Sequence, residues 1–136
     1  NILQADCRAT LKCIGDQVGL TAPAVSERVR RMEEKGVIRD FRIDIDRARL
    51  DSGMTGFILV ALEPEKYNSF CEFCRNDPGI ISHYHVIGVF NALLRFAVRG
   101  TRELDELLSA IKRYGDSQTS VELKTYFESK DIPMPE

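Results

Sequence analysis

Residues 10–38 read TLKCIGDQVGLTAPAVSERVRRMEEKGVI, and this stretch decides the first half of the fold. Thr10 and Thr21 each precede apolar residues at helical spacing, and threonine is a preferred N-cap residue. Gly19 and Gly36 stand where the two helices should end, because glycine adopts the left-handed conformation at low cost. Two short helices joined by a tight turn that contains glycine predict a helix-turn-helix.

The second of these helices has two distinct faces. Val25, Val29 and Met32 recur at helical spacing and form its buried stripe. A step of 100° per residue places the candidate DNA contacts on the far side, with one at the start of the helix: Thr21, Pro23, Ser26, Glu27, Arg30 and Arg31. Arginine can pair with guanine, glutamate can accept from cytosine, and N–H groups at a helix start suit a phosphate. An ordinary solvated face has the same pattern, so the pattern alone leaves both interpretations open.

Charge is divided unevenly along the chain. The 136 residues carry 19 Lys plus Arg and 21 Asp plus Glu, a net charge of −2. Residues 1–50 hold 10 basic and 8 acidic residues (+2), and residues 51–136 hold 9 and 13 (−4). The basic excess is concentrated within fifteen residues, at Arg28, Arg30, Arg31, Lys35, Arg39 and Arg42. A basic segment in an otherwise acidic chain favours nucleic acid as the partner.

Composition narrows the class of protein further. With 43% apolar and 29% charged residues the chain is not expected to be disordered, and four Cys are too few for a disulfide scaffold. No apolar run approaches the ~20 residues of a membrane span. We therefore expect a protein of the reducing cytoplasm that does not contact a membrane. Residues 1–4 are helical in character and have no preceding cap, which predicts a helix whose first turns are missing.

A linking segment is predicted after the helix-turn-helix. Phe41, Ile43 and Ile45 alternate with polar residues, which is the period of a half-buried strand. The polar residues 47–53 follow as a linker. We therefore expect a DNA-binding domain at residues 1–38, a linking strand and linker at 39–54, and a second domain at 55–136.

The second domain follows the order strand, helix, strand, strand, helix, strand. The strands are expected at Gly56–Leu62, Ile80–Ile87, Leu93–Val98 and Val121–Phe127, and the helices at 64–77 and 101–111, the latter capped by Thr101. This order predicts an α+β fold of the ferredoxin-like βαββαβ type. The first strand is apolar on both faces, although two helices can cover only one face of such a sheet. A second copy of the chain, packed sheet to sheet, is expected to cover the other face.

Two motifs resemble a known family. Residues 18–21, 24–33 and 36–38 look like the helix-turn-helix of the leucine-responsive and asparagine-responsive (Lrp/AsnC, or feast/famine) regulators of bacteria and archaea. Residues 84–94, YHVIGVFNALL, are similar to the strand-turn-strand of that family's effector domain. One departure is Gly15, where the family usually has Ala. Because glycine inside a helix costs about 1 kcal/mol against alanine, the first helix of the motif is expected to be weak.

The resemblance implies a transcriptional regulator that binds double-stranded DNA, needs no cofactor and is not an enzyme. It also implies a homodimer that assembles further, to an octamer, and a small-molecule effector, expected to be an amino acid. The effector site is expected around Gly88, Phe90, Asn91, Thr119 and Ser120. The family usually has Asp where this chain has Asn91. Because a carboxylate pairs better with an ammonium group, Asn91 predicts weaker binding of an amino acid, which Asn91→Asp should strengthen.

The residues are also compatible with two other functions. Cys71 and Cys74 form a C-x-x-C motif, and His83 and His85 share one face of a strand, so a metal- or redox-responsive regulator is one alternative. Both cysteines also fall on the apolar stripe of their helix, where cysteine behaves as a small hydrophobic residue. A small ferredoxin-like enzyme is the second alternative, because the fold alone does not exclude catalysis.

Overall fold

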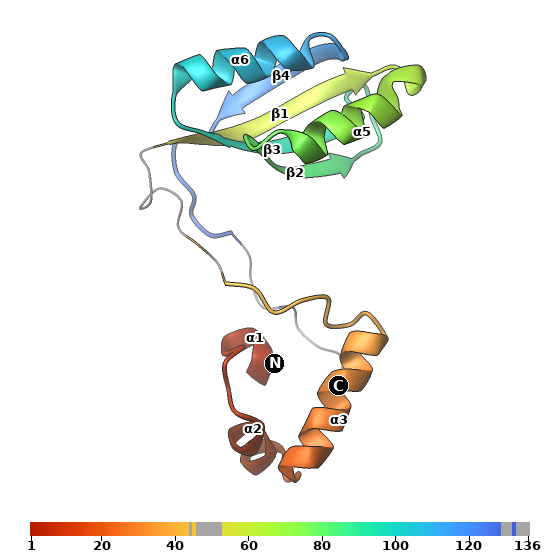
Figure 1. Ribbon diagram of the computed structural model, residues 1–136. Coiled ribbons are helices and arrows are strands. Elements are labelled where there is room, and N and C mark those ends of the chain that lie inside the picture. Colours follow the sequence, from red (N-terminus) through yellow and green to blue (C-terminus); the bar gives the residue numbers. More distant parts are fainter. Residues whose placement is uncertain (44, 46–52, 129–131, 133–136) are drawn as a thin grey trace. The chain divides into compact units, whose positions relative to one another are not determined.

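The computed structural model describes residues 1–43, 45, 53–128 and 132 (Figure 1). The chain divides into two compact units. Residues 1–45 and 127–136 make up the first unit, and residues 46–126 make up the second. These units are defined by compactness, and they group residues 127–136 with the helical segment. None of the helices in the described ranges is long and apolar enough to cross a membrane.

The first unit contains the predicted helix-turn-helix. Its helices are α1 (Ile2–Ala5), α2 (Leu11–Val18) and α3 (Ala22–Glu34). Thr10 Oγ1 accepts a hydrogen bond from Cys13 N–H at 3.2 Å, and Thr21 Oγ1 accepts from Ala24 N–H at 3.4 Å. Gly19 ends α2 in the left-handed conformation, with φ of 67°. The predicted caps and helix ends are therefore confirmed.

Gly15 permits the close packing of the turn between α2 and α3. A Cβ atom at this buried position would lie 2.3 Å from the carbonyl oxygen of Leu20. The Leu20 N–H donates to the Gly15 carbonyl at 2.9 Å, which holds the turn against the helix. The expectation that Gly15 simply weakens α2 was incomplete, because the missing side chain also makes room for this turn.

The second unit is a four-stranded antiparallel sheet with two helices (Figure 1). Its elements are β1 (Met54–Leu62), the 3-10 turn η1 (Pro64–Lys66), α5 (Tyr67–Asn76), β2 (Ile80–His85), β3 (Ala92–Val98), α6 (Thr101–Ile111) and β4 (Gly115–Val121). The strand order is β2-β3-β1-β4, and all three neighbouring pairs are antiparallel. The predicted ferredoxin-like βαββαβ fold is confirmed.

The core of this unit lies between the sheet and the helices α5 and α6. Alternate residues of β1 and β3 point into it, as the period of two along a strand requires. The buried cluster comprises Ile58, Val60, Leu62, Phe70, Cys74, Ala92, Leu94, Phe96, Val98, Leu104, Leu107 and Ile111. The helices cover only the face of the sheet that carries these residues. Among the described residues, no layer covers the opposite face.

The fourth strand was predicted in the wrong place. It runs from Gly115 to Val121 rather than from Val121 to Phe127. Residues 121–127 alternate apolar and polar side chains, which is typical of a strand, but Tyr126 and Phe127 are exposed. The polar residues of β4 form the strand because their backbone pairs with β1 at the edge of the sheet. Gly115 is needed there, since a Cβ atom would lie 1.9 Å from the carbonyl oxygen of Ala61.

The linking strand predicted at Phe41–Ile45 is not formed in the described residues 41–43 and 45. Residues 44 and 46–52 of the predicted strand and linker lie outside the described residues. Ile43 is 78% exposed, and Phe41 and Ile45 are exposed as well. An alternating segment becomes a half-buried strand only when a neighbouring strand and a packing surface are present, and the described part of one chain provides neither here.

The cap of α6 also differs from the prediction. Gly100 is the N-cap residue, and Thr101 is the first residue of the helix. The N-cap has no side-chain hydrogen bond, but Glu103 Oε2 in the first turn accepts from the N–H of Arg99, the residue before the N-cap, at 2.9 Å. This bond is displaced by one residue from that of a capping box, in which the first-turn side chain accepts from the N–H of the N-cap residue.

Candidate nucleic-acid and effector sites

The outer face of α3 carries all the residues predicted to contact DNA. Thr21, Pro23, Ser26, Arg30 and Arg31 are exposed, and Glu27 is partly exposed. Val25, on the opposite side of the helix, is buried with 3% of its surface exposed. The helix therefore presents these six side chains to solvent on one side and packs against α2 with the other.

Glu27 holds both arginines of this face. Its Oε1 accepts hydrogen bonds from Arg30 Nη2 and from Arg31 Nε, both at 2.9 Å, and its Oε2 accepts from Arg30 Nε at 2.9 Å. Arg30 also donates through Nη1 to Glu34. These pairs are three or four residues apart, the spacing at which side chains meet on a helix surface. Glu27, Arg30, Arg31 and Glu34 form one cluster, which we call the α3 ion-pair cluster.

The electrostatics of this cluster follow from its hydrogen bonds. Those donated by Arg30, and then those donated by Arg31, lower the pKa of the Glu27 carboxyl from 4.5 to about 2. The same interaction raises the pKa of Arg30. Glu27 is therefore ionised at neutral pH, and the two acids and two arginines of the cluster carry no net charge together.

The candidate effector turn is held by Asn91. The Asn91 Nδ2 group donates to the carbonyl oxygen of Leu62 at 2.9 Å, and the N–H of Leu62 donates to Asn91 Oδ1 at 2.8 Å. The backbone N–H of Asn91 donates to Val60 at 3.1 Å, and its carbonyl accepts from Val86 N–H at 3.0 Å. Sequence reasoning missed Leu62 as a partner, because a backbone partner 29 residues away leaves no local signal. The side-chain amide of Asn91 is thus occupied in fixing the turn to the end of β1.

The rest of the turn is open. Gly88 has φ of 153°, a conformation that L side chains rarely adopt. Phe90 is partly buried, whereas Ile87 and Val89 expose 104% and 87% of their surfaces. The predicted strand over Ile80–Ile87 accordingly stops at His85. An exposed turn with a glycine allows close approach to its backbone.

The remaining predicted effector residues lie elsewhere in the same chain. Ser120 pairs with Phe57 of β1, and Thr119 is its neighbour in β4. Asn91 is bonded to Leu62, at the other end of β1. The two places are five strand residues apart, about 16 Å at ~3.3 Å per residue, and β1 lies between them. One chain alone does not bring the two groups of predicted effector residues together.

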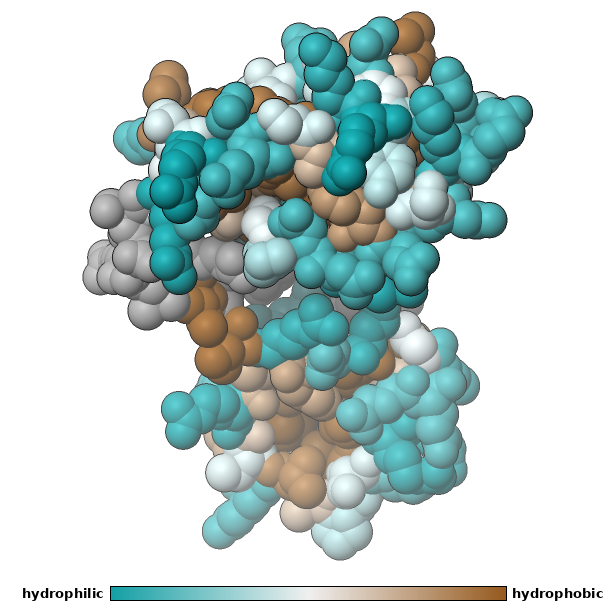
Figure 2. Space-filling view, turned by 45° about the horizontal axis from the view of Figure 1, so that its top comes forward, coloured by the Kyte–Doolittle hydropathy of each residue, from teal (hydrophilic) through white to brown (hydrophobic). Residues whose placement is uncertain are grey.

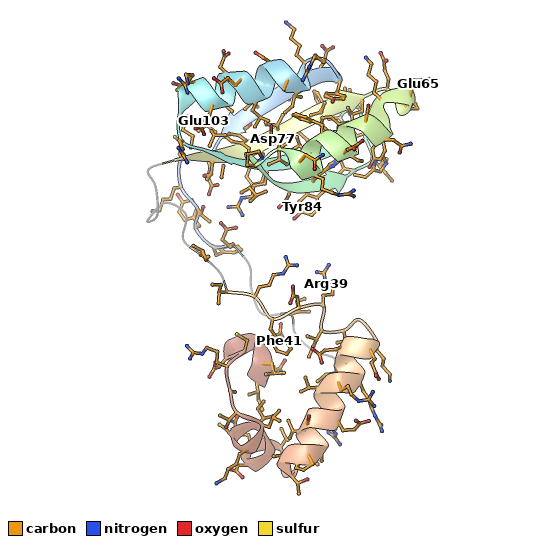
Figure 3. All side chains as sticks on the ribbon, viewed as in Figure 1. Arg39, Phe41, Glu65, Asp77, Tyr84 and Glu103 are labelled. Atoms are coloured by element: carbon orange, nitrogen blue, oxygen red, sulfur yellow. The ribbon has the colours of Figure 1, made fainter. Side chains whose placement is uncertain are left out.

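The sheet face opposite the helices is hydrophobic at its centre. Leu59 and Leu93 pair across β1 and β3 on this face, and Phe57 is 43% exposed beside them. Tyr84, 56% exposed, projects from the same face (Figure 3). The guanidinium carbon of Arg95 lies 5.8 Å from the centre of the Phe57 ring. We call these five residues the outer sheet face. Figure 2 also shows hydrophobic surface on the helical unit.

The cysteine and histidine residues do not form a metal site within the described ranges. No group of three or more His, Cys, Asp or Glu side chains there could hold a metal ion. Cys74 is buried in the core, and burial raises the pKa of its thiol to about 12. The His83 ring packs edge-on against Phe70, with 5.4 Å between the ring centres. A thiol that stays protonated is a poor ligand and a poor nucleophile, so Cys74 serves the core, and His83 packs against Phe70 of the same core.

Two family models match the chain. An AsnC-type helix-turn-helix domain matches residues 1–33, and an Lrp/AsnC ligand binding domain matches residues 55–132. The chain belongs to the Lrp/AsnC family. The resemblance noted in residues 18–38 and 84–94 is thereby confirmed, as is the expected order of a DNA-binding region before a ligand-binding domain.

Two relatives of known name are similar in sequence to this chain over most of their length. The transcriptional regulator FL11 of Pyrococcus horikoshii is 30% identical over 98% of this chain and 90% of its own. The regulator AldR of Mycolicibacterium smegmatis is 32% identical over 88% of this chain and 74% of its own. This Lrp/AsnC protein is thus a DNA-binding transcriptional regulator with a ligand-binding domain, and not an enzyme.

Solved structures share the fold of this Lrp/AsnC chain. LrpC of Bacillus subtilis has a TM-score of 0.85 at 21% identity, covering 95% of this chain and 91% of its own. A transcriptional regulator of Neisseria meningitidis, solved as a complex with L-Met, has a TM-score of 0.86 at 20% identity, covering 97% and 90%. At these identities the likeness establishes the architecture of both units.

Proposed function

We propose that this regulator reads DNA with the outer face of α3 placed in the major groove. Thr21, Pro23, Ser26, Glu27, Arg30 and Arg31 would supply the contacts. The observation that supports this most directly is that all six lie on the solvent side of a helix whose other side is buried against α2. A recognition helix needs this division, because base edges are reached only by side chains that project away from the protein.

We propose further that the effector is an amino acid and that its site is shared between copies of the chain. Gly88, Phe90 and Asn91 of one copy would face Thr119 and Ser120 of another. The separation of these two groups within one chain supports a shared site. The structure of the Neisseria meningitidis relative with L-Met supports an amino acid as the class of ligand.

The outer sheet face is the proposed contact of a homodimer. Its hydrophobic side chains are Phe57, Leu59, Leu93 and Tyr84. Removing this surface from water is favourable, and that requires a second layer to cover it. A second copy offers the same surface by symmetry. Further association of dimers, to the octamer that the family resemblance implies, would complete the shared effector sites.

Regulation then follows from linkage between assembly and DNA binding. An effector that binds one assembly better than another shifts the population toward it, and so changes the spacing of the α3 helices along the DNA. We place this activity in the cytoplasm, where the DNA of a bacterium or archaeon lies.

Genomic footprinting tests DNA binding and effector response together. Bound sites are mapped in the source organism with and without each of a panel of amino acids. We expect a limited set of sites with a shared sequence, some of which change occupancy with one amino acid. Uniform, sequence-independent occupancy would contradict specific regulation, and sites that ignore every amino acid would contradict the proposed effector class.

A further inference from the structure

The two arginines of α3 look equivalent in sequence but are held differently. Arg30 and Arg31 are neighbours, and both point to the solvent side of the helix. Both donate to Glu27, but Arg30 does so through two nitrogens and Arg31 through one. The number of N–H groups still open on each guanidinium decides what else it can bind.

Most N–H groups of Arg30 are already hydrogen-bonded. Its Nε and Nη2 atoms form a parallel pair of hydrogen bonds with the Glu27 carboxylate, and its Nη1 donates to Glu34. Recognition of guanine needs two adjacent N–H donors of one guanidinium. Three of the five N–H groups of Arg30 are bonded to carboxylates, whereas only one of the five N–H groups of Arg31 is bonded in this way. The acids hold this guanidinium, so Arg30 cannot turn its Nε–Nη2 edge to a base without breaking its bonds to Glu27.

Arg31 is anchored at one end and open at the other. Its Nε donates to Glu27 Oε1 at 2.9 Å. Within the described part of the chain its Nη1 and Nη2 atoms have no hydrogen-bond partner, and 66% of the side chain is exposed. These two nitrogens form the edge that pairs bidentately with guanine or phosphate. The bond to Glu27 restricts the side chain, so less rotamer entropy is lost when that edge binds.

We infer that Arg31 is the specificity-determining arginine of α3, that Glu27 is the residue that positions it, and that Arg30 is a structural brace between Glu27 and Glu34. This inference rests on the proposed function, since it assigns separate roles within the proposed DNA-binding face. It also gives Glu27 a role other than accepting from cytosine. Both oxygens of Glu27 already accept hydrogen bonds, and Arg30 neutralises its charge close to the phosphates.

The test begins with selection of duplexes by the full-length protein. A pool of DNA duplexes with a randomised 20-base-pair centre is enriched on the wild type, and the selected duplex is then used with each variant. We expect Arg31→Ala to weaken binding to that duplex about 10- to 100-fold, in the range of a lost guanine pair. Arg30→Ala, which removes the brace of Glu27, should weaken binding by a smaller factor than Arg31→Ala does. Circular dichroism checks that each variant keeps the helix content of the wild type.

Arg31→Lys separates reading of a base from charge alone. Lysine keeps the positive charge but has no bidentate fork. We expect this variant to retain binding to random duplex while losing the preference for one base in a repeated selection. If Arg31→Lys keeps the full preference, Arg31 acts only as a phosphate contact and the inference fails.

Glu27→Gln tests the positioning role, with Glu33→Gln as its matched control. Both variants remove one negative charge from α3, but within the described residues Glu33 has no side-chain ion pair. Both should bind random duplex more tightly, because repulsion of the phosphates falls. Only Glu27→Gln should lower the ratio of affinities for selected and random duplex, by about 5-fold or more. If the two variants have equal ratios of affinities for selected and random duplex, Glu27 does not position Arg31.

The outcomes distinguish the inference from the proposed function. If the wild type enriches no sequence from the pool, the proposed reading of DNA by α3 fails, and the assignment fails with it. If the wild type enriches a sequence but Arg30→Ala is as damaging as Arg31→Ala, the proposed function stands and the division of roles is wrong.

Discussion

The two units of the chain are stabilised in different ways. Among the described residues of the helical unit, only Ile14 and Val25 are buried hydrophobic side chains. The sheet unit has a continuous cluster of twelve. The helical unit relies instead on threonine caps, a glycine turn and the α3 ion-pair cluster, and each such surface feature contributes about 1 kcal/mol or less. The comparison shows a sheet unit with a packed core joined to a helical unit with few buried side chains.

The binding surfaces of the two units differ in a corresponding way. The outer sheet face is hydrophobic and stands on a well-packed layer, which suits a permanent contact with a second copy. The outer face of α3 is charged, exposed and neutralised by its own ion pairs, which suits a contact that forms and dissociates. The predictions below test whether the units are as independent as this contrast implies.

The largest effect is expected in the core of the sheet unit. Phe96 is fully buried between β3 and the helices, so Phe96→Ala should destabilise this unit by about 3–5 kcal/mol. Chemical denaturation followed by amide NMR signals reports both units at once. Signals from the sheet should be lost at lower denaturant, whereas those of α3 should keep their own midpoint. Simultaneous loss of both sets would show that the units are coupled and would break the comparison.

The next largest effect concerns the outer sheet face. Leu59 points away from the helices, whereas its neighbour Val60 is buried beneath them. Leu59→Glu should therefore leave the core intact and weaken the dimer by at least about 1.5–3 kcal/mol per copy, the value of a lost buried leucine. Sedimentation measures the dissociation, and Ser109→Glu on the exposed side of α6 is the control with the same charge. An unchanged assembly in the Leu59 variant would exclude this face as the contact.

Much of the fold could be predicted because the decisive side chains are local. Thr10 and Thr21 act within three residues, and the apolar stripes of the helices repeat within one turn. β4 could not be placed in this way. Residues 115–121 are mostly polar, and their strand conformation depends on backbone hydrogen bonds to β1. Residues 121–127 had the better side-chain pattern but no strand to pair with.

Asn91→Asp should destabilise the sheet unit rather than improve it. A carboxylate can still accept from Leu62 N–H, but it cannot donate to the Leu62 carbonyl, and two oxygens would then face each other. The expected loss is about 1–3 kcal/mol at neutral pH. A protonated carboxyl can donate, so the deficit should shrink as the pH falls toward 4. The prediction from sequence concerns a different quantity, the affinity for an amino acid, which Asn91→Asp is expected to raise because a carboxylate pairs better with an ammonium group.

Thermal unfolding at several pH values measures this effect, with Asn68→Asp as the control. Asn68 is exposed in the first turn of α5, where an added negative charge is neutral or slightly stabilising. Calorimetry with free amino acids then reports whether the turn binds an effector. Unchanged stability in the Asn91 variant would contradict the structural role of the amide, and tighter amino-acid binding would support the prediction from sequence.

The candidate sites were only partly predictable for a related reason. The helical period correctly places Ser26, Glu27 and Arg30 on one exposed face. The period does not show which acid each arginine pairs with, because the pairing depends on side-chain rotamers. Nor does any local pattern reveal that the Asn91 amide is bonded to Leu62, since the two meet only when β1 and β3 pair.

A smaller effect is expected at Gly15 in the helical unit. Gly15→Ala gains about 1 kcal/mol in helix propensity, but its Cβ would displace the Leu20 carbonyl and so strain the turn. We expect a net loss of about 1 kcal/mol, confined to the α2 and α3 signals. Gly100→Ala is the matched control, because a Cβ there meets nothing within 4 Å. A net gain would mean that the turn can shift freely.

The smallest effect, and the most direct test of the α3 ion-pair cluster, is the titration of Glu27. A pKa lowered from 4.5 to about 2 means that the ionised form is favoured in the folded state. Its contribution to stability is therefore present above about pH 4.5 and is lost as the pH falls through about 2. Carboxyl NMR signals should show Glu27 titrating near pH 2 rather than near 4.5. Because the hydrogen bonds from Arg30 are the largest cause, Arg30→Ala should raise the Glu27 pKa more than Arg31→Ala does. The reverse order would mean that Arg31 holds Glu27 most firmly, and it would leave Arg30 as the arginine free to read DNA.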